Sequence, residues 1–200
     1  MPLATERDVQ AALAPYNSRI RRAIDRGFAK YVRRLASGPN LWKRTDSVDI
    51  SDCVTKELLK EFEGKVGITV FRKHETVKLL FGRRVVVRFK KSGRNGLGMN
   101  AATRANNNFL NPNLPFQDAP HAMKVEICWK LNATGTGCSD IIVAARNGDG
   151  ALWSYSLPGG RQKVFEFPAR EATPREENGR RSIVKLKEGK GKRRKADDAS

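Results

Sequence analysis

The side chains best suited to chemistry in this 200-residue chain are basic, and they gather in separate clusters. Its 39 Lys and Arg oppose 21 Asp and Glu, which gives a formal net charge of +18 at pH 7. The central cluster follows one predicted strand and the loop after it, and its members are Arg84, Arg88, Lys90, Lys91 and Arg94. Lysine and arginine that neutralise the phosphates of a nucleic acid release condensed counterions, which drives binding without reading the base sequence. The cluster therefore predicts a nucleic-acid partner that is contacted through its phosphate backbone.

Two further groups of residues extend the predicted interface. A second basic surface is expected on an N-terminal helix, where Arg22, Arg26 and Arg33 accompany an apolar stripe and stay in solvent when that stripe is buried. Arg104 and the asparagines at 106–108 fall in a polar segment after the basic strand, where they could contact bases or sugars. The pattern leaves the choice between DNA and RNA open.

A metal-dependent nuclease is the enzymatic alternative that these charges leave open. A restriction-endonuclease-like core places an acid two residues before a Lys on a strand, so that carboxylates hold a divalent cation beside the attacking water. The corresponding strand here reads Val87-Arg88-Phe89-Lys90, with arginine at the position of the acid. Other acids have no spacing that brings them together, and they are Glu57, Glu61, Glu75, Glu126 and Asp140. We therefore expect binding rather than catalysis, with an active or degraded nuclease core as the alternative.

Residues for nucleophilic or cofactor chemistry are scarce. His74 and His121 fall in predicted turns, and no Gly-x-Ser-x-Gly elbow accompanies them. A zinc site made of His121, Cys128 and Cys138 lacks the closely paired ligands that zinc sites usually bring. Residues 93–98 are glycine-rich but lack the Lys-Ser/Thr end of a phosphate-binding loop. We expect no metal and no cofactor.

Cysteine usage and hydropathy limit the cellular compartments in which the protein is expected. The three cysteines are an odd number without a CxxC spacing, which is typical of a reduced intracellular chain. No apolar run approaches the roughly 18 residues of a membrane span, and the N-terminus lacks the apolar core of a signal peptide. We expect a cytoplasmic protein without a membrane partner.

Hydrophobic periodicity predicts the elements that position these residues. Apolar residues recur at helical spacing over 5–35, Pro15 predicts a break in that helix near Ala14, and a second helix is expected over 51–63. Strands are expected over 66–71, 76–81, 83–89, 123–131, 141–145 and 151–157, with a short edge strand open at 164–167. Residues 147–150 read Asn-Gly-Asp-Gly, a hairpin signal. Gly, Asn and Pro between 92 and 120 predict a long loop that contains a short helix over 101–110.

Alternation within the strand at 83–89 predicts how the sheet faces. Val85, Val87 and Phe89 share one side, which is expected to face the core. The other side carries Arg84, Val86, Arg88 and Lys90 and is expected to present cations to solvent. The fold class is α+β, with N-terminal helices packed on a mostly antiparallel sheet of about six strands, and a disordered basic C-terminal tail. The expected regions are a basic helical segment at 1–45, an α+β core domain at 46–168 and the tail at 169–200.

Part of the chain resembles a known group of proteins. The shared features are the basic strand end Phe89-Lys90-Lys91, the helical stretch 100–109, the turn Leu114-Pro115 and the late Trp153. They resemble a family of uncharacterised bacterial proteins encoded near helix-turn-helix and metallopeptidase regulators of mobile elements. The chain departs from that family at 111–113, where Asn-Pro-Asn stands in place of a Gln before the Leu-Pro turn. The resemblance implies a prokaryotic, phage or mobile-element context, and no activity or catalytic residue.

Together these features predict a nucleic-acid-binding accessory protein that contacts the phosphate backbone through basic patches. Besides the nuclease, the remaining alternative is an interaction module whose partner is an acidic protein, because the same cations would attract clustered carboxylates.

Overall fold

Helices build the N-terminal part of the fold. The computed structural model describes residues 4–38, 40–73 and 76–158. Helix α1 (Glu6–Leu13) follows Thr5, whose hydroxyl accepts a hydrogen bond from the backbone N–H of Asp8 at 3.2 Å. A 3₁₀ turn at Ala14–Tyr16, which contains the predicted break at Pro15, separates α1 from α2 (Asn17–Ala36). The break predicted near Ala14 is thus confirmed.

Helix α3 (Lys43–Phe62) begins eight residues earlier than the sequence predicted. Its first turns are polar, so no apolar periodicity marks them. The Asn40 side-chain amide, just before the helix, donates hydrogen bonds to the carboxylates of Asp46 and Asp49, at 3.0 Å each. The helix also runs across residue 45, where the sequence analysis placed the end of the basic helical segment.

A six-stranded sheet forms the centre, and its strands stand in sequence order. The strands are β1 (Ile68–Lys73), β2 (Thr76–Phe81), β3 (Val85–Lys91), β4 (Met123–Leu131), β5 (Cys138–Asn147) and β6 (Gly150–Ser156). All neighbouring pairs are antiparallel except β3 and β4, which run parallel and are joined by the crossover that contains α4 (Arg104–Leu110). The predicted α+β class is confirmed. The predicted hairpin between β5 and β6 is also present, with Gly148 at a φ of +58°.

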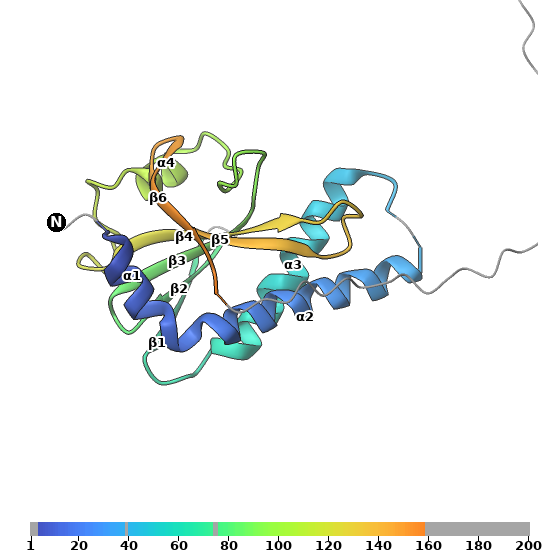
Figure 1. Ribbon diagram of the computed structural model, residues 1–200, viewed down its shortest axis with the longest axis horizontal. Coiled ribbons are helices and arrows are strands. Elements are labelled where there is room, and N and C mark those ends of the chain that lie inside the picture. Colours follow the sequence, from blue (N-terminus) through green and yellow to red (C-terminus); the bar gives the residue numbers. More distant parts are fainter. Residues whose placement is uncertain (1–3, 39, 74–75, 159–200) are drawn as a thin grey trace, which may run out of the picture. The chain divides into compact units, whose positions relative to one another are not determined.

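The N-terminal helices cover one face of the sheet, as predicted. Figure 1 shows α1 and α2 along one side of the strands and α4 on the opposite side. Val85 and Val87 of β3, which the alternation assigned to the core, are buried there. They belong to one apolar cluster with residues of β4 and of the helices, among them Ile127, Trp129, Ile24, Phe28 and Phe62.

The opposite face, called the outer face below, is covered as well. Its strand residues are Lys78 and Leu80 of β2, Val86, Arg88 and Lys90 of β3, and Lys124, Glu126 and Cys128 of β4. Phe109 of α4 and Ala122 of the crossover pack there on Leu80 and Val86 in a second, smaller apolar cluster. The expectation that this face presents its cations to solvent is therefore wrong for Arg88, which is buried, whereas Arg84 is exposed and Lys90 is half-buried. Period-two alternation assigns residues to a face without saying what covers it.

Some predicted features fall outside the described residues, namely the edge strand at 164–167 and the tail at 169–200. Among the described residues, no helix combines the length and the apolar character that crossing a membrane requires.

Close contact between α2 and α3 depends on Gly27. A Cβ atom at this position would lie 2.6 Å from Val54 Cα and 2.7 Å from Val54 Cγ2. We expect Gly27→Ala to lower the unfolding free energy by about 1–3 kcal/mol, because overpacking outweighs the roughly 1 kcal/mol that alanine gains in helix propensity. Urea denaturation measures the difference. Ser18→Ala, at an exposed position of α2, serves as the control and should change stability by less than about 0.5 kcal/mol. A Gly27→Ala protein as stable as the wild type would contradict the close packing.

Candidate nucleic-acid interface

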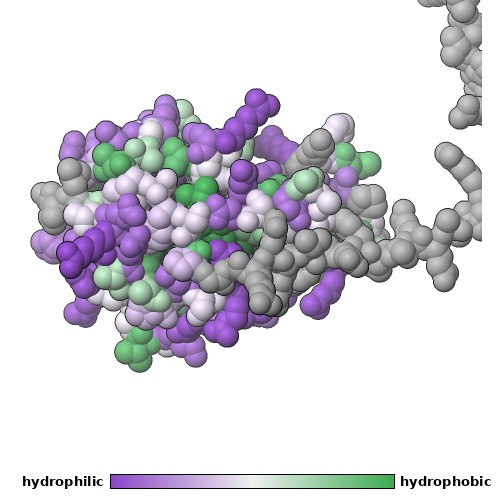
Figure 2. Space-filling model, viewed as in Figure 1, coloured by the Kyte–Doolittle hydropathy of each residue, from purple (hydrophilic) through white to green (hydrophobic). Residues whose placement is uncertain are grey.

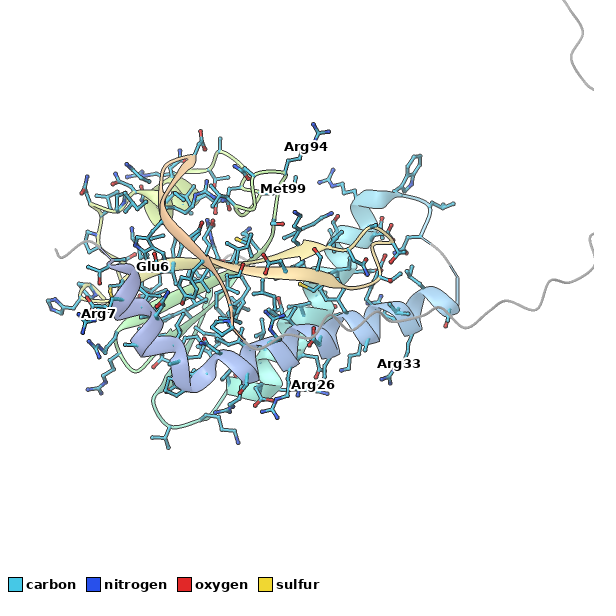
Figure 3. The ribbon with its side chains drawn as sticks, viewed as in Figure 1. Glu6, Arg7, Arg26, Arg33, Arg94 and Met99 are labelled. Atoms are coloured by element: carbon cyan, nitrogen blue, oxygen red, sulfur yellow. The ribbon has the colours of Figure 1, made fainter. Side chains whose placement is uncertain are left out.

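The structure divides the nine predicted binding residues into three groups by exposure. Arg84, Arg94, Arg104, Arg22, Arg26 and Arg33 are exposed, Lys90 and Lys91 are half-buried, and Arg88 is buried. Figure 3 shows Arg94 and Met99 projecting from the loop after β3, whereas Arg26 and Arg33 lie along α2 on the other side of the molecule in this view. The two predicted basic surfaces are therefore separate.

Arg88 is 2 % exposed and bound to Glu126, which is fully buried. Its Nε lies 3.1 Å from Glu126 Oε1, and its Nη2 donates to the same oxygen. Arg146 of β5 completes the group, with Nη1 3.0 Å from Glu126 Oε2. Glu126 thus pairs with two guanidinium groups inside the protein, and Arg88 has a structural role rather than the predicted exposed contact.

Helix α4 is fastened to this buried group. Arg88 Nη1 donates to Asn106 Oδ1 at 2.7 Å, and the Arg88 guanidinium carbon lies 4.5 Å from the centre of the Phe109 ring. Asn106, predicted as a base or sugar contact, is thereby committed to the interior. Asn107 and Asn108 remain exposed on the same helix.

The glycine-rich loop after β3 closes over the same carboxylate. A Cβ at Gly98 would lie 2.9 Å from Glu126 Oε2 and 3.0 Å from Lys90 Cβ, so only glycine fits there. The loop is tied back to β3 by the hydrogen bond from Met99 N to Lys91 O at 3.1 Å. Lys91 itself faces α3, where its Nζ donates to Ser47 Oγ at 2.9 Å. These contacts hold Arg94 at the exposed end of an ordered loop.

The basic side of α2 is partly neutralised by α3. Arg26 Nε lies 3.1 Å from Glu57 Oε2, and its Nη2 lies 2.7 Å from Glu61 Oε2. Arg19 binds Glu61 as well, and this hydrogen bond holds the pKa of Glu61 below its usual value. Lys30 adds a further contact with Glu57. The sequence analysis expected the cations of α2 to lie in solvent. Instead, several of them form ion pairs with Glu57 and Glu61 of α3.

Acids are absent from one long stretch of the chain. Residues 76–117 carry eight Lys and Arg and no Asp or Glu, and the cations are Lys78, Arg83, Arg84, Arg88, Lys90, Lys91, Arg94 and Arg104. Within the described part of the chain, Arg88 alone among these eight forms an ion pair. This stretch, called the acid-free segment below, spans β2, β3, the loop and α4.

Sequence reasoning missed two lysines beside the acid-free segment's aromatic residues. Lys78 Nζ lies 6.0 Å and Lys124 Nζ 5.9 Å from the centre of the Phe109 ring, which Arg88 also contacts. The antiparallel register, which opposes Lys78 to Arg88, is the signal that could have placed Lys78 on the outer face. Lys124 donates to the carbonyl oxygens of Asn108 and Asn111 at the end of α4, at 2.9 and 2.7 Å.

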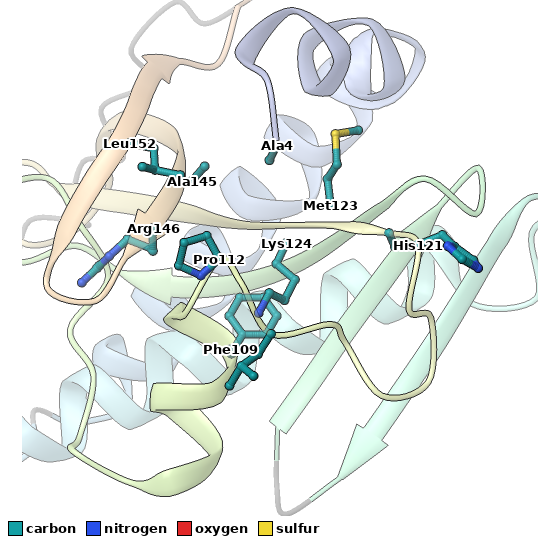
Figure 4. A pocket seen from close by; sticks show the side chains of 11 residues that line it. Ala4, Phe109, Pro112, His121, Met123, Lys124, Ala145, Arg146 and Leu152 are labelled. Carbon is teal, nitrogen blue, oxygen red and sulfur yellow. The ribbon is translucent and has the colours of Figure 1, made fainter. Parts of the chain in front are cut away.

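A small surface pocket borders Lys124. Figure 4 shows Lys124 reaching over the Phe109 ring, beside Pro112, while Arg146 points away from it. Both cations are already bound, Lys124 to the carbonyl oxygens of α4 and Arg146 to Glu126 and to Gly148 O. The pocket therefore offers no unpartnered charged group for a ligand.

The acids proposed for a nuclease do not converge. Glu57 and Glu61 lie on α3, whereas Glu126 faces α4 across the sheet and is held by two arginines. Asp140 accepts from Ser156 Oγ at 3.0 Å, and Glu75 lies outside the described residues. Among the residues that the structure describes, no group of three His, Cys, Asp or Glu side chains is arranged to hold a metal ion.

The two cysteines considered for zinc are buried thiols. Burial raises the pKa of Cys128 and of Cys138 to about 12, so both are protonated at neutral pH. His121 is exposed on the turn before β4.

Comparisons with known proteins place the chain in no established group: no protein-family model, no curated protein and no solved structure matches it.

Removing the charge of Glu126 tests the buried group. Glu126→Gln keeps the shape but leaves Arg88 and Arg146 without a counter-charge, and we expect a loss of about 3–5 kcal/mol in unfolding free energy. Glu63→Gln is the matched control, because Glu63 forms an exposed pair with Arg72 and should cost less than about 1 kcal/mol. Denaturant titration measures the unfolding free energy of both variants. Equally small losses of stability in the two would show that Glu126 does not hold the outer face together.

Lys124 gives the stability a predicted pH dependence. Burial lowers the pKa of Lys124 to about 8 in the folded protein, whereas an unfolded lysine titrates near 10.4. Between these values the unfolded chain binds more protons, so this lysine makes the unfolding free energy rise with pH, by at most about 1.4 kcal/mol per pH unit.

The measurement is the difference in unfolding free energy between the wild type and Lys124→Met from pH 7 to pH 9.5. We expect wild-type stability to gain on the variant as pH rises, and Lys124→Arg, which does not titrate in this range, to behave like Lys124→Met. Because Lys78 and Lys90 are common to all three proteins, their contributions cancel. A constant or falling difference would contradict the lowered pKa.

Proposed function

We propose that this protein binds nucleic acid through the phosphate backbone, using the acid-free segment as its principal surface. The observation that carries the proposal is the distribution of charge. Residues 76–117 contain eight cations and no acid, and of these eight only Arg88 forms an ion pair with a described residue. In contrast, the acids of α3 engage the cations of α2.

The exposed members of the segment are suited to phosphate contacts. Arg84 ends the turn between β2 and β3, Arg94 projects from the glycine-rich loop, and Arg104 begins α4. Guanidinium groups bind phosphate oxygens in a bidentate manner and release counterions, so the affinity falls steeply with salt. Hydrophilic residues dominate the face shown in Figure 2, with hydrophobic residues in small separate groups, which suits a polar interface.

Two other functions use the same residues differently. An acidic protein partner would be attracted by the same cations. A nuclease would require acids that lie apart in the fold. The mobile-element context rests on the resemblance of residues 83–157 to the bacterial family named above.

A triple variant tests the surface. We expect Arg84→Gln, Arg94→Gln and Arg104→Gln together to weaken binding of labelled duplex DNA, single-stranded DNA or RNA, and to reduce the slope of log K against log salt by about 2–3 units, near 0.9 per lost phosphate contact on duplex DNA. The stability should stay within about 0.5 kcal/mol, since these side chains are exposed.

The matched control removes three other exposed cations, Lys56, Lys60 and Arg72, each of which has an acidic partner. It changes the net charge equally, so an equal loss of affinity in the control would mean that the total charge, rather than this surface, drives binding. A second comparison, Arg22→Gln with Arg33→Gln, measures the share of the α2 surface. Absence of binding at physiological salt would overturn the proposal, and cleavage in the presence of magnesium or manganese would favour the nuclease.

A further inference from the structure

Among the residues that the structure describes, Lys78 and Lys90 of the outer face have no acidic partner within ion-pair distance. Lys78 opposes Arg88 in the β2–β3 pair, and Lys90 follows Arg88 by two residues on the same face of β3. The carboxylate of Glu126 is already bound by Arg88 and Arg146. The outer face therefore carries an excess of positive charge next to its buried network.

The environment of Lys78 is aromatic and half-buried. Its Nζ lies 5.7 Å and 6.0 Å from the ring centres of Phe116 and Phe109, and 3.4 Å from Thr76 Oγ1. That long hydrogen bond is the one polar contact of Lys78 Nζ within the described part of the chain. Asp118 attracts it from a distance without forming an ion pair, while Arg88 and Lys90 repel it.

Lys90 has fewer polar contacts than Lys78. The loop at Gly98 lies close to its stem, since a Cβ added at Gly98 would lie 3.0 Å from Lys90 Cβ. Among the described residues it has neither a hydrogen bond nor an ion pair, and its side chain remains partly exposed. Arg88 repels its charge, and Glu126 attracts it from behind the two arginines.

Holding two such ammonium groups costs free energy in the unliganded protein. Burial is the largest effect that lowers the pKa of both lysines, and the repulsion of Arg88 follows in each case. An anion with several oxygen atoms would reverse this cost, because each ammonium would gain a charge-assisted hydrogen bond.

We propose that Lys78 and Lys90 bind one phosphate group at this end of the β2–β3 pair, where Lys78 also donates to Thr76 Oγ1. This inference rests on the proposed function and deepens it, because the phosphate is taken to belong to a nucleic-acid backbone that crosses the acid-free segment between Arg84 and Arg104. Thr76 and Lys90 lie at the same end of the strand pair and on the same face, since they stand two residues beyond the opposed Lys78 and Arg88. A free inorganic phosphate has the same chemistry, and the experiment separates the two sources.

The variants are Lys78→Met, Lys90→Met and the double variant, which keep the apolar stems. In chloride buffer we expect them to be at least as stable as the wild type, because they remove cations that lack a counter-charge. A clear loss of stability would show that the lysines have a structural role and would overturn the site.

The direct measurement is NMR of the lysine Nζ and Cε groups during titration with inorganic phosphate at constant ionic strength. We expect the resonances of Lys78 and Lys90 to shift together, with Lys124, which is bound to α4 carbonyls, as the internal control. Each single variant should weaken phosphate binding about tenfold, the loss of one charge-assisted hydrogen bond. Unchanged resonances, or equal shifts of all lysines, would overturn the proposal.

The second arm uses duplex DNA across a salt series. One shared phosphate predicts that the double variant lowers the salt slope by about 0.9, no more than either single variant does, whereas two independent contacts would lower it by about 1.8 and would overturn a shared site. Duplex binding that is unchanged in the double variant would remove this site and leave the surface of Arg84, Arg94 and Arg104 intact. Phosphate binding at the two lysines without duplex binding would instead keep the site and overturn the nucleic-acid function.

Discussion

Burial of one carboxylate between two guanidinium groups is the constraint on which the outer face depends. Glu126 is fully buried, and transfer of any one of these charges from water would cost several kcal/mol without its partners. The requirement extends outward from the carboxylate: Gly98 must lack a side chain, and Asn106 must stay in place to accept from Arg88. The loop and α4 therefore owe their positions to an electrostatic group as much as to the small apolar cluster around Phe109.

The same constraint separates structural cations from those available to a partner. Cations that meet an acid, such as Arg88 in the sheet and Arg26 on α2, hold elements together. Those of the acid-free segment that meet none remain exposed or half-buried, and Lys78 lies beside aromatic rings. A high net charge alone therefore says little about the interface. The positions of thirteen acids among the described residues determine which of the cations are left for phosphate.

Periodicity predicted the fold well because it reports directly which side of a strand or helix is apolar. It placed Val85 and Val87 toward the helices. The turn residues at 147–150 separately located the β5–β6 hairpin. Periodicity failed at Arg88, since the cover of a face comes from α4, a distant and weakly patterned segment. The early start of α3 was missed because side-chain hydrogen bonds from Asn40, rather than apolar spacing, support its first turns. The pairing of Arg26 with Glu57 depends on how α2 and α3 face one another, and the apolar periodicity of each helix does not report this.

The single parallel pair divides the sheet into two antiparallel meanders, β1–β3 and β4–β6. Within each meander the strands are joined by short connections, so little loop-closure entropy opposes their pairing. The 31 residues between Lys91 and Met123 form a long connection, and ordering it costs entropy when β3 pairs with β4. Buried contacts of Glu126 with Arg88 on one meander and Arg146 on its own offset that entropy at the junction. The connection that carries Arg94 and Arg104 thus also joins the two halves of the sheet.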